Sequence, residues 1–120
     1  MAEEPTNLIT FEGTVDELYQ KIGGHEGPVV VKFGSTTCMP CKRLKQLLPS
    51  MARENASTLF LNVEIDQQAD PKSYKDAFGI TSVPNVFYFK GKDAEGKPQN
   101  LGNIVGLQIP QIKAKIAEIQ

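Results

Sequence analysis

The chain has no tryptophan, one histidine and two cysteines, Cys38 and Cys41, among its 120 residues. A structural zinc site uses four cysteine or histidine ligands, so one copy of the chain does not complete such a site. A metal site shared between two copies remains an alternative. The length is sufficient to bury a hydrophobic core without disulfide staples, and we expect one domain over residues 1–120.

An excess of charge of either sign is also lacking, since the formal net charge is −1. This balance gives no broad basic surface, so we expect no binding to nucleic acid or to acidic membranes. No apolar run approaches the roughly 18 residues of a membrane span. Three cations, Lys42, Arg43 and Lys45, follow the second cysteine, in a pattern typical of a solvated helix face.

Residues 1–5, Met-Ala-Glu-Glu-Pro, are acidic and polar and lack the basic start and apolar stretch of a secretion signal. We therefore expect a cytoplasmic protein, and we expect it to act as a monomer. Structural disulfides are rare in the cytoplasm, so a Cys-x-x-Cys pair there indicates redox chemistry or metal binding.

Hydrophobic periodicity predicts that strands and helices alternate. Apolar and β-branched runs predict strands over residues 7–11, 29–33, 58–65, 85–89 and 101–105, with a turn over 91–97. Helical spacing predicts helices over 14–23, 42–51, 70–79 and from 110 onward, the second kinked or broken at Pro49. Thr14 and Glu17 fit a capping box, and Asp70-Pro71 fits a helix start. The order βαβαβαββα predicts an α/β protein with helices on both faces of a mixed sheet.

The cysteines lie where a buried strand leads into a helix, in the sequence Cys38-Met39-Pro40-Cys41. Cys38 is then near the helix N-terminus, where free backbone N–H groups and the helix dipole favour a thiolate over a thiol. A thiolate attacks disulfides, and a second thiol three positions along resolves the mixed disulfide. The pattern therefore indicates thiol–disulfide exchange, with two inert core thiols as an alternative.

Three segments carry a family resemblance: Cys-Met-Pro-Cys-Lys at 38–42, Val-Glu-Ile-Asp at 63–66, and Ile-Thr-Ser-Val-Pro at 80–84 before an aromatic strand. Together they resemble the thioredoxin family, and Gly106 matches that family's glycine beside the active site. The similarity covers roughly residues 8–119. It implies the thioredoxin fold, a central mixed β-sheet of about five strands flanked by about four α-helices. It also implies a protein-disulfide reductase that maintains cell redox homeostasis.

The resemblance implies a role for each matching residue. Cys38 would be the nucleophile and Cys41 the resolving cysteine of a redox-active disulfide. In the family, the proline that corresponds to Pro84 follows a cis peptide bond and packs against that disulfide. The residues implied to bind substrate are Thr37, Met39, Pro40, Val83, Pro84 and Gly106.

The resemblance implies neither a bound cofactor nor a metal. Electrons would come from NADPH through a thioredoxin reductase, and the other implied partners are disulfide-containing proteins such as peroxiredoxins. One alternative is a disulfide exchanger that is linked to glutathione or otherwise independent of the reductase. Another is a non-catalytic adaptor that uses the cleft of the fold to hold partners.

Three features of the sequence depart from the family pattern. Residues 34–37, Gly-Ser-Thr-Thr, replace the usual Trp-Ala-x-Trp before the nucleophile, and Met39 replaces the usual glycine between the cysteines. Lys32 stands where the family usually has a buried aspartate that assists deprotonation of the second cysteine. One hypothesis is that Lys32 lowers the thiol pKa values or acts as a base. The other is that its side chain reaches the sheet edge or pairs with Glu64 or Asp66.

Overall fold

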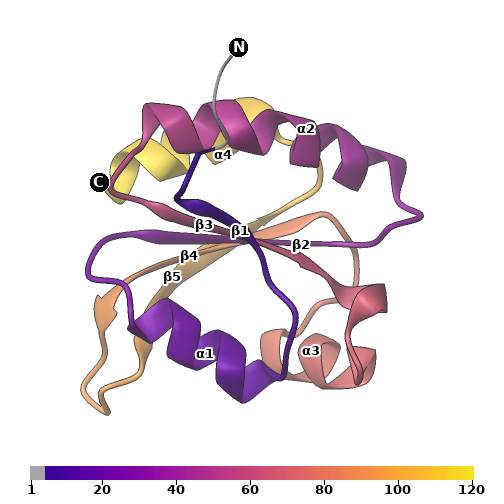
Figure 1. Cartoon of the computed structure of the whole chain (residues 1–120), viewed down its shortest axis with the longest axis horizontal. Helices are drawn as coiled ribbons and strands as arrows, with labels where there is room; N and C mark the ends of the chain where they lie inside the picture. The colour runs from indigo at the N-terminus through magenta and orange to yellow at the C-terminus, as the bar shows by residue number, and fades with distance from the viewer. Residues whose placement is uncertain (1–4) are drawn as a thin grey trace.

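A five-stranded mixed β-sheet forms the middle layer of the protein, with two helices on each face (Figure 1). This computed structural model describes residues 5–120. Its elements in chain order are β1 (Leu8–Thr10), α1 (Val15–Gly23), β2 (Val29–Gly34), α2 (Met39–Glu54), β3 (Leu59–Glu64), the 3₁₀ turn η1 (Ile65–Gln67), α3 (Pro71–Phe78), β4 (Asn85–Lys92), β5 (Pro98–Val105) and α4 (Ile109–Glu118). The predicted order of strands and helices is confirmed.

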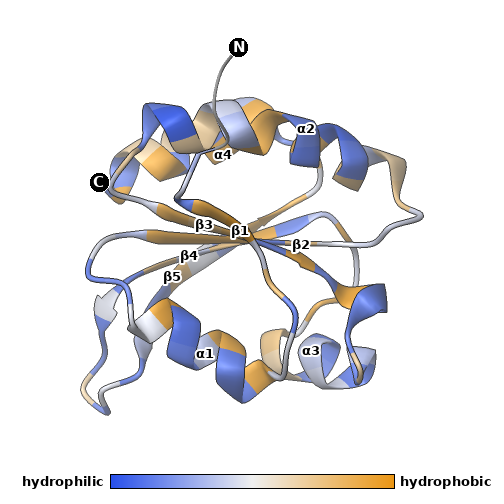
Figure 2. Ribbon diagram, in the orientation of Figure 1, coloured by the Kyte–Doolittle hydropathy of each residue, from blue (hydrophilic) through white to orange (hydrophobic). Residues whose placement is uncertain are grey.

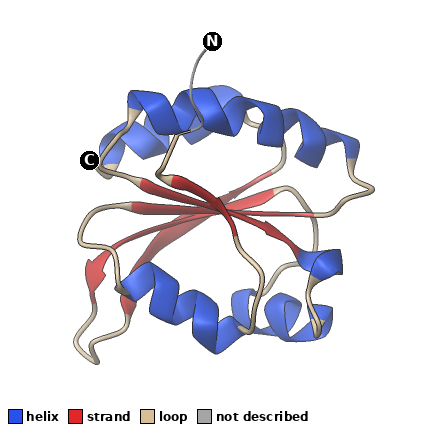
Figure 3. Cartoon of the chain, in the orientation of Figure 1, coloured by secondary structure: helices blue, strands red, loops and turns tan. Residues whose placement is uncertain are grey.

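The strand order is β1-β3-β2-β4-β5, so β2 lies at the centre of the sheet. β1, β3 and β2 run parallel, whereas β4 pairs antiparallel with β2 and β5 antiparallel with β4. Helices α1 and α3 cover one face, and α2 and α4 cover the other (Figure 3). Because β2 and β4 are antiparallel neighbours, the end of β2 and the start of β4 meet at the same edge of the sheet. The candidate site lies at this edge.

Strand β2 is buried along its whole length, as its apolar run predicts for a strand covered on both faces. Val29, Val31 and Phe33 join the core under α1 and α3, and Val30 joins the core under α2 and α4. Figure 2 shows the same division, with hydrophobic strands in the middle and hydrophilic residues on the outer sides of the helices. The charged residue of β2 is Lys32, which is also buried.

Local capping signals begin and end the helices as predicted. At α1, the Thr14 hydroxyl accepts a hydrogen bond from Glu17 N, and Glu17 Oε1 accepts one from Thr14 N at 2.8 Å. The bond from the Thr14 backbone N–H lowers the pKa of the Glu17 carboxyl. At α3, Asp70 caps the first turn, and Gly79 ends the helix in the left-handed conformation, with φ of 65°.

Of the two outcomes predicted at Pro49, a kink or a break, the break is wrong, because α2 continues through this residue to Glu54. Proline removes the N–H that would bond the carbonyl of Lys45, four residues earlier. Lys45 lies on the exposed side of α2, where water can bond its carbonyl. Leu48 and Met51, which flank Pro49, are both buried in the core, and their packing holds the helix together.

The hairpin between β4 and β5 is longer than predicted. The predicted turn over 91–97 is too wide, since β4 continues to Lys92 and β5 begins at Pro98. Asp93 holds the tighter turn, because its Oδ1 accepts hydrogen bonds from Glu95 N at 2.9 Å and Lys97 N at 3.0 Å. Pro98 fits the first position of an edge strand, where its missing N–H costs little.

Residues 1–4, which carry most of the acidic start, lie outside the described part of the chain. Within residues 5–120, every helix is too short or too polar to cross a lipid bilayer.

Candidate active site

Cys38 and Cys41 form a disulfide at the point where the loop after β2 enters α2, with their Cα atoms 5.2 Å apart. Cys38 is the N-cap residue of the helix, and Met39 and Pro40 follow in its first turn. The backbone N–H of Cys41 donates a hydrogen bond to Cys38 Sγ over 3.2 Å. A sulfur in this position faces the free N–H groups of the helix start, which stabilise a thiolate there after reduction.

The two sulfur-bearing residues differ in exposure. Cys41 is 1% exposed and lies on the buried side of α2, whereas Cys38 is only half-buried. Met39 and Pro40, between them, are exposed, and the Met39 side chain is 62% accessible. An incoming molecule therefore reaches Cys38 before it reaches Cys41.

The loop before β4 faces the disulfide. Its Val83–Pro84 peptide bond is cis, and the Val83 carbonyl oxygen lies 3.8 Å from Cys38 Sγ. The Gly106 N–H, just after β5, donates a hydrogen bond to the Pro84 carbonyl over 2.8 Å. Gly106 has φ of 91°, a conformation that favours glycine. The segments around residues 38, 84 and 106, far apart in sequence, thus meet at one edge of the sheet.

A groove of about 390 Å³ runs beside the disulfide, between the start of α2 and the loops before β4 and after β5. Its lining residues are Met39, Pro40, Arg43, Val83, Pro84, Gly106 and Leu107. Five of these residues were expected at a substrate site, whereas Arg43 was predicted only as part of a solvated helix face. The helical spacing of Arg43 from Met39, four positions earlier, was the signal that could have placed it in the groove.

Thr37 lies in the loop before Cys38 and outside this groove. Its hydroxyl is 3.1 Å from the Ser35 hydroxyl. The neighbouring Thr36 donates hydrogen bonds to Asp66 from its backbone N–H and from its hydroxyl. The bond from the Thr36 hydroxyl lowers the pKa of the Asp66 carboxyl. Asp66 therefore links the loop before the nucleophile to η1, the turn that follows β3, a role that sequence reasoning missed.

Lys32 points to the α2 side of the sheet and is 1% exposed. Its ammonium group donates hydrogen bonds to Asn62 Oδ1 over 3.0 Å and to Glu64 Oε1 over 3.3 Å. The prediction that Lys32 pairs with Glu64 is confirmed, and the alternatives of Asp66 as partner or a reach to the sheet edge are wrong. Burial lowers the pKa of the Lys32 ammonium group, and the negative charge of Glu64 opposes this effect.

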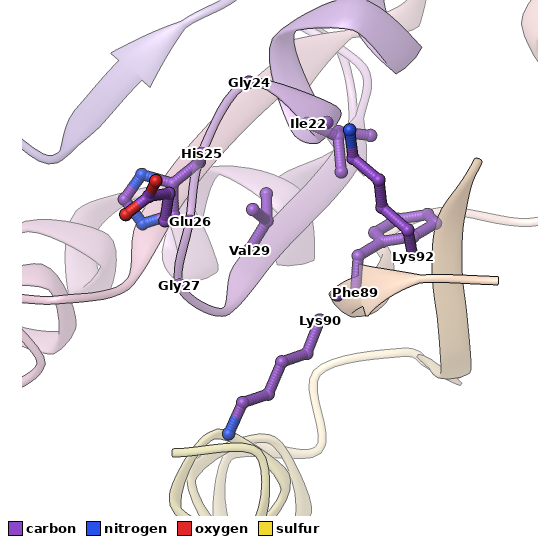
Figure 4. Close-up of a pocket in the computed structure, with 11 residues that line it drawn as sticks. Ile22, Gly24, His25, Glu26, Gly27, Val29, Phe89, Lys90 and Lys92 are labelled. Atoms are coloured by element: carbon purple, nitrogen blue, oxygen red, sulfur yellow. The ribbon is translucent and has the colours of Figure 1, made fainter. Parts of the chain in front are cut away.

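A second pocket, of about 550 Å³, lies at the opposite end of β2 and β4 (Figure 4). His25 and Glu26 line it from the loop before β2, and Lys90 and Lys92 line it from the end of β4. His25 Nε2 lies 2.9 Å from the carbonyl oxygen of Ser57, so this ring contacts the neighbouring loop and not the cysteines.

Within residues 5–120, no group of three or more histidine, cysteine, aspartate or glutamate side chains is placed to hold a metal ion. The two sulfurs are instead bonded to one another. A disulfide at a helix start, open through one sulfur, in an α/β fold with the sheet order described above, defines a thiol–disulfide oxidoreductase.

Comparison with known proteins identifies the family. The thioredoxin family model matches residues 10–114. Human thioredoxin is 30% identical over 119 residues, which cover 99% of each chain, and thioredoxin H9 of Arabidopsis thaliana is 26% identical over 94% of this chain and 74% of its own. The solved structure of Trichomonas vaginalis thioredoxin is 34% identical, superposes with a TM-score of 0.86, and covers 98% of this chain and 100% of its own. The chain belongs to the thioredoxin family.

Proposed function

We propose that this protein reduces the disulfide bonds of other proteins, with Cys38 as the nucleophile and Cys41 as the resolving cysteine. The observation that carries the proposal is the unequal exposure of two bonded cysteines at the start of α2. Cys38 is half-buried and lies beside Val83 at the rim of the groove, whereas Cys41 is 1% exposed. A second protein can therefore reach only Cys38, and Cys41 can react only with Cys38.

The exchange has two steps. The Cys38 thiolate attacks one sulfur of a substrate disulfide, so a Cys38–substrate bond forms and the other substrate sulfur leaves as a thiolate. The Cys41 thiolate then attacks Cys38 Sγ, the bond to the substrate breaks, and its electron pair goes to the substrate sulfur. The products are the reduced substrate and the Cys38–Cys41 disulfide.

The groove beside the disulfide is the proposed binding site for the substrate chain. Its apolar wall and the exposed Met39 suit an extended peptide segment next to a disulfide. The residues proposed to contact substrate are Thr37, Met39, Pro40, Val83, Pro84 and Gly106. Lys32, beneath Cys41, is proposed to tune the chemistry of the cysteines rather than to touch the substrate.

The oxidised protein needs an electron donor to act again. A thioredoxin reductase that uses NADPH is the proposed donor, and disulfide-containing proteins such as peroxiredoxins are the proposed substrates. Membership of the thioredoxin family supports both partners. The protein is proposed to act as a monomeric single domain in the cytoplasm, and its formal net charge of −1 suits a role without nucleic acid or membrane.

NADPH-coupled reduction of insulin, with a thioredoxin reductase as the sole electron source, tests the proposal. We expect NADPH oxidation that depends on this protein and stops in a Cys38→Ser, Cys41→Ser double variant. Turnover that survives in the double variant contradicts the proposed chemistry. Activity that requires glutathione in place of the reductase favours the glutathione-linked alternative, and complete absence of dithiol-dependent turnover favours the adaptor.

A further inference from the structure

A buried polar cluster lies under the first turn of α2. Lys32 and Asn62 are each 1% exposed and stand opposite one another on β2 and β3. Glu64 stands opposite Gly34, one pleat further along, and its Oε1 accepts hydrogen bonds from Lys32 Nζ and from Asn62 Nδ2. Burying an ion pair has a desolvation cost of several kcal/mol per ion before its attraction is counted. Because this cluster has a high desolvation cost and lies next to a reactive cysteine, we expect its function to lie in the reaction.

The cluster borders Cys41. A Cβ atom added to Gly34 would lie 2.7 Å from Lys32 Nζ and 3.1 Å from Cys41 Cβ. The ammonium group and the Cys41 side chain therefore border the same small space beside the Gly34 Cα. Of the three residues of the cluster, Lys32 is the one whose polar atom lies within 3 Å of this Cβ position.

Exposure increases along the cluster toward Glu64. Cys41 and Lys32 are each 1% exposed, whereas the Glu64 side chain is 10% exposed. The Cys41 thiol has no comparable access to water of its own. Lys32 and then Glu64 therefore offer a route toward solvent for a proton that leaves Cys41.

We propose that Glu64 is the proton acceptor for the Cys41 thiol and that Lys32 relays the proton between them. This inference rests on the proposed function, because it concerns the second step of that exchange. The family usually has its acid–base group on the central strand, where this chain has Lys32. In this chain, the proposed proton acceptor lies on the neighbouring strand β3.

The relay balances as follows in atoms and charge. Lys32 Nζ first gives one of its protons to Glu64 Oε1, and the neutral amine that results then takes the proton of Cys41 as the S–H bond breaks. Lys32 is again an ammonium group, Glu64 becomes a neutral carboxylic acid, and Cys41 becomes a thiolate. The thiolate attacks Cys38 Sγ, and the departing substrate thiolate takes up a proton from solvent, to which Glu64 also returns its own.

The charged and titratable groups around Lys32 Nζ fit this relay. Burial lowers the pKa of the ammonium group, which makes proton transfer to Glu64 easier, and Lys45 on α2 acts in the same direction. The negative charge of Glu64 on β3 raises the pKa of Lys32 and so opposes both effects, which keeps Lys32 and Glu64 paired before the reaction begins. On β4, Tyr88 shares this face of the sheet, and burial raises the pKa of its phenol, so it stays neutral.

A purely electrostatic role for Lys32 predicts the opposite effect of one substitution. If the positive charge of Lys32 only stabilised the Cys41 thiolate, removal of the Glu64 negative charge would strengthen that effect and speed up the second step. If Glu64 accepts the proton, its replacement by glutamine slows the second step. Glutamine keeps an oxygen for Lys32 and for Asn62 to bond, so the packing is preserved.

Rapid mixing of the reduced protein with dithiobis(nitrobenzoate) separates the two steps. Attack by Cys38 releases a first thionitrobenzoate, and resolution by Cys41 releases the second. We expect Glu64→Gln to slow the second release by about a hundredfold, the lower end of general acid–base effects, and to leave the first unchanged. In that variant the second rate should rise in proportion to hydroxide concentration. Lys32→Met should slow the second release as well, and Glu64→Asp, which keeps a carboxylate, should slow it less than Glu64→Gln.

Asp76→Asn is the matched control, since it removes the carboxylate of an exposed ion pair with Lys72 on α3 and should change neither release. A second release in Glu64→Gln that is as fast as in the wild type, or faster, overturns the relay. Equal slowing of both releases also overturns it, because it shows a loss of site structure. A wild-type protein that releases only one thionitrobenzoate contradicts the proposed function itself, so the two failures are distinguishable.

Discussion

Gly34 leaves the space that the Lys32 ammonium group occupies. A Cβ atom on Gly34 would lie 2.7 Å from Lys32 Nζ and 3.0 Å from Lys32 Cε, and 3.1 Å from Cys41 Cβ. Real Cβ atoms do not approach other heavy atoms at the first of these distances. The absence of a side chain at the end of β2 is therefore what lets a buried lysine lie beside the resolving cysteine.

Gly34→Ala should destabilise the protein by about 1–3 kcal/mol, the usual range for overpacking a filled core. Lys32 is hydrogen-bonded in place, and Cys41 is fixed on α2, so neither yields easily. Urea unfolding of both proteins measures the difference. Gly23→Ala is the control, because the nearest atom to its added Cβ, Pro98 Cγ, is 3.6 Å away and alanine is the better helix former. Equal stability of the Gly34 variant and the wild type would show that the cluster repacks freely.

Cys41→Ser should trap the covalent intermediate with substrate. Cys38 still attacks, but serine does not resolve the mixed disulfide, so the complex accumulates. Mass spectrometry after incubation with a disulfide-linked peptide should show the adduct, which dithiothreitol releases. Cys38→Ser should give no adduct under the same conditions, because Cys41 is 1% exposed. Equal adduct formation by the two variants would contradict the assignment of roles.

Lys32→Met should remove a gain in stability at alkaline pH. Burial lowers the pKa of Lys32 in the folded protein below the ordinary lysine value of 10.5. As the pH rises toward 10.5, the folded protein releases this proton before the unfolded chain does, so the unfolded chain binds more protons and stability increases. Unfolding free energies near neutral pH and above pH 10.5 measure this, with the wild type gaining relative to the variant. A constant difference between the two proteins across that window would contradict the lowered pKa.

Tyr74→Phe should cost about 1 kcal/mol near neutral pH, because the Tyr74 hydroxyl donates a hydrogen bond to the Gly13 carbonyl. Burial, together with the charge of Glu17, raises the pKa of Tyr74 to about 12. Since the unfolded chain then ionises first, this contribution is present below pH 10 and is lost as the pH rises toward 12. Denaturant unfolding across this range measures the loss.

Tyr88→Phe provides the contrast to Tyr74→Phe. Among the described residues, the buried Tyr88 hydroxyl has no hydrogen-bond partner, so its removal should leave stability unchanged or raise it. A similar cost for the two substitutions would show that loss of the hydroxyl, and not of its hydrogen bond, controls the effect.

The order of strands and helices and the position of the cysteines were predictable from local signals. The capping box of Thr14 and Glu17, the Asp70-Pro71 start and the Cys38 N-cap each involve residues within a single helical turn. Such signals act over short distances in the chain, so the sequence specifies them directly. The prediction failed where packing outweighed a local preference, as when core contacts kept α2 continuous through Pro49.

By itself, then, the sequence determined the fold class, the strand-to-helix placement of the cysteine pair and the type of chemistry that this pair performs. Only the tertiary structure decided which groups surround it. The pairing of β2 with β3 sets Lys32 opposite Asn62 and Gly34 opposite Glu64. This register places Glu64, and not Asp66, within reach of Lys32. The pairing of β2 with β4 likewise brings Val83 to Cys38. Because β2 and β3 are buried on both faces, the alternation within either strand does not fix their register, and contacts between the two distant segments decide it.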